Sequence, residues 1–474
     1  MAGRAESLLI DLVWERQLGQ PALPVAPLSD AEKAAGLQRI QRERARAAAE
    51  EAELIMSLAA ARPATDDPAP GTPGARETGW AVDEAYGGAS EFFTAELAAV
   101  LNVGRKTAGY RYGRARTWTT KLPLTFAALQ AGEIDERRAA ELADVLQHTS
   151  ADMAGQVEDA LIGETTNLSV ARLKARATEE MLRLDSAAAD ERREAAEKAA
   201  DVHLYPSATE GRATLATDLP ADEAVECFDI VDGIARMLKD DGDERPIGQL
   251  RAHVASMLIR RPADDGLPTV VANLTVTADL AALEGSSTAP GEVNGLPITA
   301  AHLRELLARV GALGLTAPDG GEMGYAITGP DGELLATLTP AELARLAKLD
   351  GPVAGPPPET DAYEPTDKQR AFVTARDRRC RFPNCGQRVG WTDLDHVTSH
   401  ACGGATDCAN LCCLCRSHHR LKTFARGWQF RIDDDGTLHV TTPSGVTRTT
   451  RPPGLRPPAA PPPTPRPPEE PPPF

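Results

Sequence analysis

Residues 380–422 read CRFPNCGQRVGWTDLDHVTSHACGGATDCANLCCLCRSHHRLK and hold seven of the eight cysteines of the chain. Four residues separate Cys380 from Cys385, and two separate Cys415 from His418. The second pair would lie on one helical turn, where positions i and i+3 share a face. Three thiolates and one imidazole form a common structural zinc site, which stabilises a small module. The spacing therefore predicts Zn²⁺ on these four side chains; the alternative is that the thiols are unligated.

A second group of residues lies between and beside the predicted zinc ligands. In chain order it comprises Asp395-His396, Gly403-Gly404, Asn410-Leu411, His419 and Lys422. Together with the two ligand pairs, this order resembles the HNH family, whose fold is two strands and a helix around one divalent metal ion. The resemblance implies an endonuclease that hydrolyses DNA phosphodiester bonds.

The resemblance implies a role for each side chain of this group. His396 would be the general base, and Asn410 would hydrogen-bond across the loop and fix the orientation of His396. Asp395 and His419 would hold the catalytic divalent ion, Mg²⁺ or Mn²⁺. Two basic side chains beside the site would contact DNA phosphates, namely Arg420 and Lys422.

Elementary chemistry suits these residue types to phosphodiester hydrolysis. A neutral imidazole is a good base near pH 7, and a divalent cation can stabilise the phosphate charge and the leaving oxygen. Adjacent helical residues point about 100° apart, so His418 can face zinc while His419 faces the cleft. Neighbours in a regular strand point to opposite faces, so Asp395 and His396 can share a site only where the strand ends or twists.

Weaker matches extend from about residue 90 to about residue 450 and resemble one family of actinobacterial HNH proteins, the 13E12 repeat family. Its N-terminal domain is a domain of unknown function (DUF222), so the resemblance gives the body no biochemical role. The matching segments include Leu122-Pro123, Ala131-Gly132-Glu133-Ile134, Gly242-Asp243-Glu244-Arg245, Arg376-Asp377 and Gly427-Trp428. Two positions depart from the usual pattern: Asn384 replaces a Gly, and Asp395 stands where many members carry His. Asn also tolerates turns.

Composition shifts divide the chain and predict an α+β protein. A capping box at Ser29–Glu32 opens a long helix, and Pro/Gly-rich stretches interrupt the helical pattern. The C-terminal tail has 13 prolines in 23 residues, which is typical of an extended or disordered segment. The predicted segments are an N-terminal segment (1–28), a long helix (29–62), a flexible linker (63–90), a mostly helical body with a small sheet (91–350), a linker (351–365), the ββα-metal HNH module with structural zinc (366–451) and the tail (452–474).

Local patterns predict elements within the body. A hairpin is expected at residues 202–219 with its turn at Glu210-Gly211, followed by a helix from Pro220. A β-branched strand is expected at Val270–Val276, and further helices near residues 299–311 and 339–348.

Charge is unevenly distributed along the chain. The net charge is -18, yet residues 366–451 carry 14 Lys/Arg against 8 Asp/Glu, a balance of +6 that leaves -24 for the rest. Contact with DNA should therefore be local to this module. We find no secretory signal and no apolar run of the length that a membrane helix needs, so we expect a cytoplasmic protein without membrane contact.

A second stretch could also contact DNA. Residues 94–108 resemble a helix-turn-helix, whose second helix would carry Arg105, Lys106, Arg111, Arg114 and Arg116. The alternative, which we favour, is an ordinary helical hairpin with a solvated basic face, because no base-reading side chain is evident.

The sequence thus predicts a metal-dependent HNH endonuclease that acts on DNA. The alternative is a zinc-stabilised DNA-binding or regulatory protein whose nuclease site is vestigial. The intact base, orienting Asn and metal ligands favour the first hypothesis.

Overall fold

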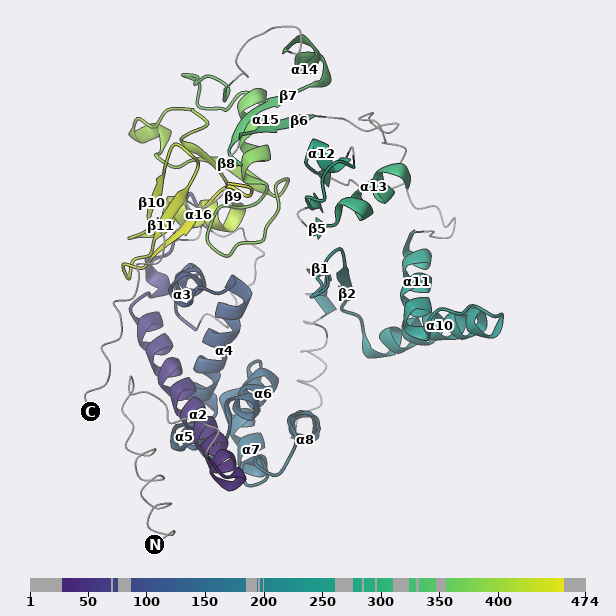
Figure 1. Cartoon of the computed structure of the whole chain (residues 1–474). Coiled ribbons are helices and arrows are strands. Elements are labelled where there is room, and N and C mark those ends of the chain that lie inside the picture. The colour runs from purple at the N-terminus through teal and green to yellow at the C-terminus, as the bar shows by residue number, and fades with distance from the viewer. Residues whose placement is uncertain are drawn as a thin grey trace, which may run out of the picture.

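The N-terminal region is mostly helical with small sheets, and the C-terminal region has small antiparallel sheets and two helices (Figure 1). The C-terminal region also holds a cluster of three cysteines and one histidine. In the part of the chain that the structure describes, no helix is both long and apolar enough to cross a membrane. The computed structural model describes residues 28–455 except 70, 76–86, 185–193, 195–196, 199, 261–275, 284, 295, 310–323, 330–331 and 347–354.

The long helix α2 (Asp30–Ala60) confirms the prediction for residues 29–62. Its capping box forms as expected, since the Ser29 side chain accepts from the backbone of Glu32 and the Glu32 side chain accepts from the backbone of Ser29. Its buried face is built mainly from alanine, which lets neighbouring helices approach closely. The buried residues of α2 are Ala45, Ala49, Ala52, Ile55 and Ala59.

A helical bundle forms around α4, which packs against α2, α3, α5, α6 and α7. Its core contains fully buried leucines and the Trp118 indole, whose Nε1 donates to the carbonyl of Ala139 at 2.8 Å. The remaining helices of the bundle are α3 (Phe93–Leu101), α4 (Arg105–Lys121), α5 (Pro123–Ala131), α6 (Glu136–Leu146), α7 (Ala151–Leu161) and α8 (Val170–Leu184).

The helices α3 and α4 form the helical hairpin that was expected at residues 94–108. Two of its basic side chains make ion pairs within the bundle: Arg111 with Glu51 and Arg114 with Asp144, both at 2.7 Å. These arginines hold α4 to α2 and α6, which favours the ordinary hairpin over a DNA-reading helix.

The middle of the chain is a series of small units. The predicted hairpin at 202–219 and the helices near 220, 299–311 and 339–348 are confirmed, whereas the strand expected at Val270–Val276 lies outside the described residues up to 275. The elements are β1 (Val202–Pro206), β2 (Ala213–Thr217), α10 (Ala221–Asp240), α11 (Ile247–Arg260), β3 (Val276–Thr277), α12 (Leu280–Leu283), β4 (Gly291–Val293), β5 (Leu296–Ile298), α13 (Ala300–Arg309), β6 (Tyr325–Thr328), β7 (Leu334–Leu338) and α14 (Pro340–Leu346).

The C-terminal module contains the ββα unit that positions the candidate site. Its antiparallel hairpin pairs β8 with β9, and α16 packs against both strands. A separate three-stranded sheet follows in the order β10-β11-β12. The elements are α15 (Asp367–Asp377), β8 (Thr392–His396), β9 (Leu411–Cys415), α16 (Arg416–Phe424), β10 (Gln429–Ile432), β11 (Leu438–Thr441) and β12 (Thr447–Thr450).

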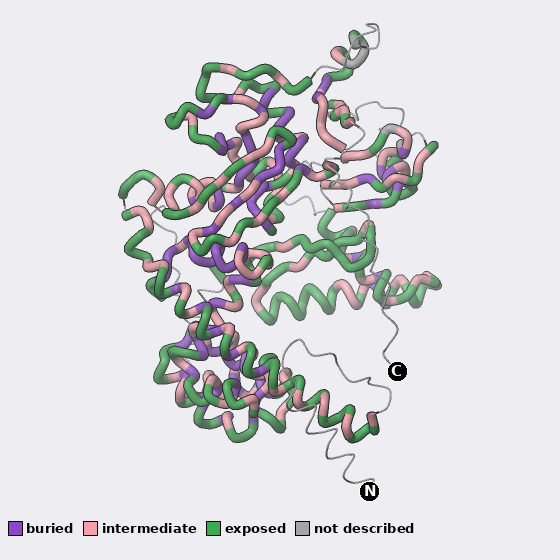
Figure 2. Tube along the Cα trace, turned by 60° about the vertical axis from the view of Figure 1, so that its left-hand side comes forward, coloured by how far each residue is buried: buried purple, intermediate pink, exposed green. Residues whose placement is uncertain are grey.

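Figure 2 shows where buried residues lie along the chain, and one hydrophobic cluster contains residues of both the module and the helical bundle. Phe92 and Ala95, at the start of α3, pack into the core of the module. The Arg448 side chain donates to the carbonyls of Ala99 and Val100 at 2.7 and 2.9 Å, and so caps the C-terminal end of α3. The bundle therefore supports the module directly.

A buried charged network ties α15 to the strands of the module. Asp377 is fully buried and pairs with the nearly buried Arg376 and Arg381 at 2.8 and 3.0 Å. Its second carboxylate oxygen accepts from the backbone of Cys413. The two arginines in turn donate to backbone carbonyls, including that of Thr450 in β12.

Asp377→Ala should destabilise the module by about 3–5 kcal/mol, because it leaves two buried guanidinium groups without their partner. Thermal unfolding of the full chain measures this loss. Glu43→Ala is the control, since it removes an exposed carboxylate paired with Arg39 and should cost no more than about 0.5 kcal/mol. Equal shifts in the two variants would contradict the structural role of the network.

Candidate metal centre and active site

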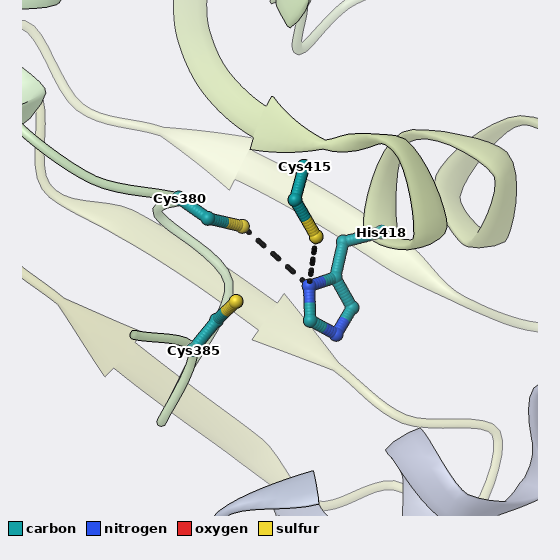
Figure 3. Close-up of side chains that lie close together, drawn as sticks. All are labelled: Cys380, Cys385, Cys415 and His418. Atoms are coloured by element: carbon teal, nitrogen blue, oxygen red, sulfur yellow. Dashed lines mark hydrogen bonds between the residues drawn. The ribbon is translucent and has the colours of Figure 1, made fainter. Parts of the chain in front are cut away.

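The four predicted zinc ligands converge on one point (Figure 3). Cys380 and Cys385 come from the loop after α15, Cys415 ends β9, and His418 lies in the first turn of α16. Their ligand atoms all lie within 4.8 Å of one another. The His418 Nδ1 is 3.2 Å from the Cys415 sulfur and 3.5 Å from the Cys380 sulfur. The cluster could therefore hold a zinc-like ion, with Nδ1 as the imidazole ligand.

Local geometry explains how the first two cysteines reach the cluster. Asn384 has φ of 59°, in the left-handed region, which Asn adopts more readily than most residues. Its conformation closes a turn in which the backbone of Cys385 donates to the carbonyl of Phe382 at 3.1 Å. The Phe382 ring stacks on His418 with a centroid distance of 3.9 Å and an angle of 5°, which fixes the orientation of the imidazole.

The electrostatics of the cluster also suit a cation. Hydrogen bonds from the Cys380 and Cys385 thiols lower the pKa of Cys415, whereas hydrogen bonding to Cys385 and Cys415 raises the pKa of Cys380. A bound cation would stabilise all three crowded thiols as thiolates. Burial lowers the pKa of His418, which favours the neutral, metal-binding imidazole.

In the second group, His419 on α16 lies beside the two carboxylates Asp393 and Asp395 of β8. The Nε2 of His419 is 3.5 Å from an Asp395 oxygen, while its Nδ1 donates to Asp393 at 2.8 Å. His418 and His419 thus face different partners, as the helical angle predicts.

Asp393 belongs to this site, although the sequence analysis missed it. A carboxylate that accepts from Nδ1–H favours the tautomer that can bind a metal ion through Nε2, the nitrogen that lies 3.5 Å from an Asp395 oxygen. The period of two along a strand was the available signal, because Asp393 lies two residues before Asp395 and shares its face.

His396 is the last residue of β8, and its pairing with Leu411 is the last pair between β8 and β9. It is only 5% exposed. Its Nε2 lies 2.8 Å from the Thr406 hydroxyl, and the carbonyl of Thr406 accepts from the Gln369 side chain at 2.7 Å. Burial lowers the pKa of His396, and the neighbouring His400 and Lys422 act in the same direction against Asp395. The imidazole is therefore neutral near pH 7.

Asn410 pins the loop that follows His396. Its side chain accepts from the backbone of Thr398 at 2.8 Å and donates to the carbonyls of Thr398 and Ala405 at 3.0 and 2.8 Å. A Cβ at Gly404 would lie 1.9 Å from the Thr398 carbonyl oxygen, so this closed loop requires glycine. The cross-loop hydrogen bonds match those expected of Asn410.

The two predicted phosphate contacts have partners within the protein. The Lys422 ammonium donates to the His396 carbonyl at 2.6 Å and lies 3.0 Å from Asp395. Arg420 forms a bidentate ion pair with Glu91, both distances being 2.8 Å. Both basic side chains are largely buried. Glu91 lies 329 positions from Arg420 in the sequence, so the local sequence pattern could not predict this ion pair. Contact of Arg420 or Lys422 with DNA stays a prediction.

Comparisons with known proteins identify partial relatives. The chain is 47% identical over 90 residues to the uncharacterized protein Rv3776 of Mycobacterium tuberculosis strain H37Rv. These 90 residues are 19% of this chain and 17% of that protein. Rv2100 of the same strain is 44% identical over 90 residues, 19% of this chain and 16% of that protein. A third uncharacterized protein of that strain is 32% identical over 161 residues, 32% of either chain. No family model and no solved structure matches.

Proposed function

We propose that this protein is a metal-dependent DNA endonuclease of the HNH type. The observation that carries the proposal is that Asp395 and His396 are the last two residues of β8, and that His419 of α16 lies 3.5 Å from Asp395. The neutral His396 provides the base, and the adjacent carboxylate and imidazole provide metal ligands. The resemblance of the same residues to the HNH motif supports this assignment.

The protein side chains divide the work of hydrolysis. His396 takes a proton from the attacking water, which makes the water a stronger nucleophile. If Nε2–H donates to the Thr406 hydroxyl, Nδ1 is the nitrogen that accepts this proton. Lys422 holds the backbone at His396, and Asn410 holds it two residues further on, at Thr398. Thus the protein orients the base before substrate arrives.

A divalent cation would bind beside this base. Asp395 and His419 would hold Mg²⁺ or Mn²⁺, and Asp393 keeps the His419 imidazole in the metal-binding tautomer. Mg²⁺ commonly uses one or two protein carboxylates and completes its coordination with water and phosphate oxygens. When bound, such an ion stabilises the charge on the phosphate and on the leaving oxygen.

Incubation of the purified full chain with supercoiled plasmid tests the proposal. We expect nicked or linear DNA with Mg²⁺ or Mn²⁺, and none when the divalent ion is withheld. Zinc content is measured in parallel, so that loss of cleavage is not confused with loss of the Cys3His ion. Zinc-loaded protein that binds DNA and cleaves none of a range of substrates would contradict the proposal.

The second candidate is a zinc-stabilised DNA-binding or regulatory protein with a vestigial nuclease site. The observation that favours it is the internal pairing of Arg420 and Lys422, which leaves these cations less able to grip phosphate. Binding without cleavage in the plasmid assay distinguishes this candidate from the nuclease.

Thr406→Val should lower kcat by about tenfold with little change in KM, because the variant keeps the shape but removes the partner of His396 Nε2. Thr406→Ser restores the hydroxyl and should restore kcat. Steady-state cleavage measures both variants. A valine variant with wild-type kcat would mean that Thr406 does not orient the base.

A further inference from the structure

Tyr363 is an exposed aromatic residue beside the candidate base. Residues 355–455 contain seven Phe, Tyr and Trp side chains. Five of them pack in the two cores of the module, whereas Tyr363 and Trp391 are 66% and 79% exposed. Exposure of single rings is ordinary, so the position of Tyr363 is what distinguishes it.

The Tyr363 ring covers the site from one side. It stacks on the His396 imidazole with a centroid distance of 5.4 Å and an angle of 23°. It also meets His400 edge-on at 5.6 Å. The ring therefore contacts the general base while most of its surface stays accessible to solvent.

The backbone on both sides of Tyr363 is anchored. Before it, the backbone of Thr360 donates to the carbonyl of Thr406 at 3.1 Å. After it, Thr366 and Gln369 form a capping box at the start of α15, and the Gln369 amide also donates to Thr406. Residues 355–365, the described part of the linker predicted at 351–365, are thus bound to the module. A ring held in this way loses little conformational entropy when it binds a ligand.

We propose that Tyr363 stacks on a nucleobase next to the scissile phosphate, and that the site prefers DNA with unpaired nucleotides there. This inference rests on the proposed nuclease function. A base offers its flat face to an aromatic side chain only where it is not stacked within an intact duplex. Trp391 offers a second exposed ring just before β8, roughly 17 Å from His396 by the rise of an extended strand. The net charge of +6 on residues 366–451 favours a nucleic acid strand between them.

The test compares Tyr363→Leu with Tyr363→Phe on three oligonucleotides of one sequence: single strand, duplex with an unpaired bubble, and full duplex. Each carries 2-aminopurine, and binding is measured by fluorescence in the His396→Ala background, so turnover does not interfere. Tyr363→Leu should weaken binding of the two unpaired substrates about tenfold, while Tyr363→Phe retains their affinity. Tyr110→Leu is the matched control, because Tyr110 is a tyrosine of similar exposure, 59%, on α4 of the helical bundle.

The outcomes separate this inference from the nuclease proposal. Equal effects of Tyr363→Leu on unpaired and duplex DNA, or no effect, would overturn the stacking role. A lower kcat with unchanged affinity in the cleavage assay would instead make Tyr363 a positioning residue for His396. Tyrosine-dependent binding of unpaired DNA by a protein that never cleaves would support the stacking role and contradict the nuclease.

Discussion

Removal of the ion from the Cys3His cluster should unfold the C-terminal module. Structural zinc contributes an apparent 10–16 kcal/mol in small zinc-stabilised units, and the cluster joins the loop after α15 to β9 and α16. Cys415→Ser should therefore lose the ion and the cooperative unfolding transition of the module. Metal analysis should find about one zinc per wild-type chain, and circular dichroism with limited proteolysis should report the loss of structure.

Cys402→Ser is the matched control for this experiment. Cys402 lies in the same module, but it is exposed and outside the cluster. Its replacement should leave zinc content and the melting temperature nearly unchanged. In Cys415→Ser, α3 should become sensitive to protease together with β8, β9 and α16, because Phe92 and Ala95 share a core with the module. A Cys415→Ser protein that is metal-free and still folded would rule out a structural role for the ion.

Sequence patterns predicted those parts of the molecule that depend on short spacings. The capping box at Ser29 and the cysteine pairs each involve residues within a few positions of one another. Local geometry constrains the capping box and each pair by itself, whereas the convergence of the two pairs is inferred from the ligand set of a zinc site; the structure confirms the helix and the convergence of Cys380, Cys385, Cys415 and His418. The catalytic roles drawn from the HNH resemblance stay predictions.

Contacts between distant segments could not be predicted in the same way. Arg420 reads as a basic residue beside the site until the fold brings Glu91 against it. Tyr363 reads as part of a linker until Thr360 pairs with Thr406 across the module. Both contacts depend on tertiary packing, which leaves no periodic pattern in a single sequence. They bear directly on which side chains remain available for substrate.

His396→Ala should lower the cleavage rate by about 10²–10⁴, the usual contribution of a positioned general base. Zinc content and DNA binding should be nearly unchanged, because His396 is not among the four cluster ligands. His439→Ala is the control, since His439 belongs to the same module but pairs with Asp433 in the separate sheet. The pH dependence of plasmid nicking by the wild-type protein gives a further check on the base. Because His396 acts only when it is unprotonated and its pKa is lowered, the wild-type cleavage rate should fall only as pH drops below about 6.5, the ordinary histidine value.

His419→Ala separates the base from the metal site. This variant should also lose activity, but excess Mn²⁺ should partly restore it because Asp395 and the substrate can still bind the ion. Excess metal should not restore His396→Ala, since a cation cannot accept the proton from water. Cleavage that survives His396→Ala would assign the base elsewhere. His400 would then be the next candidate, because its ring lies 5.7 Å from that of His396.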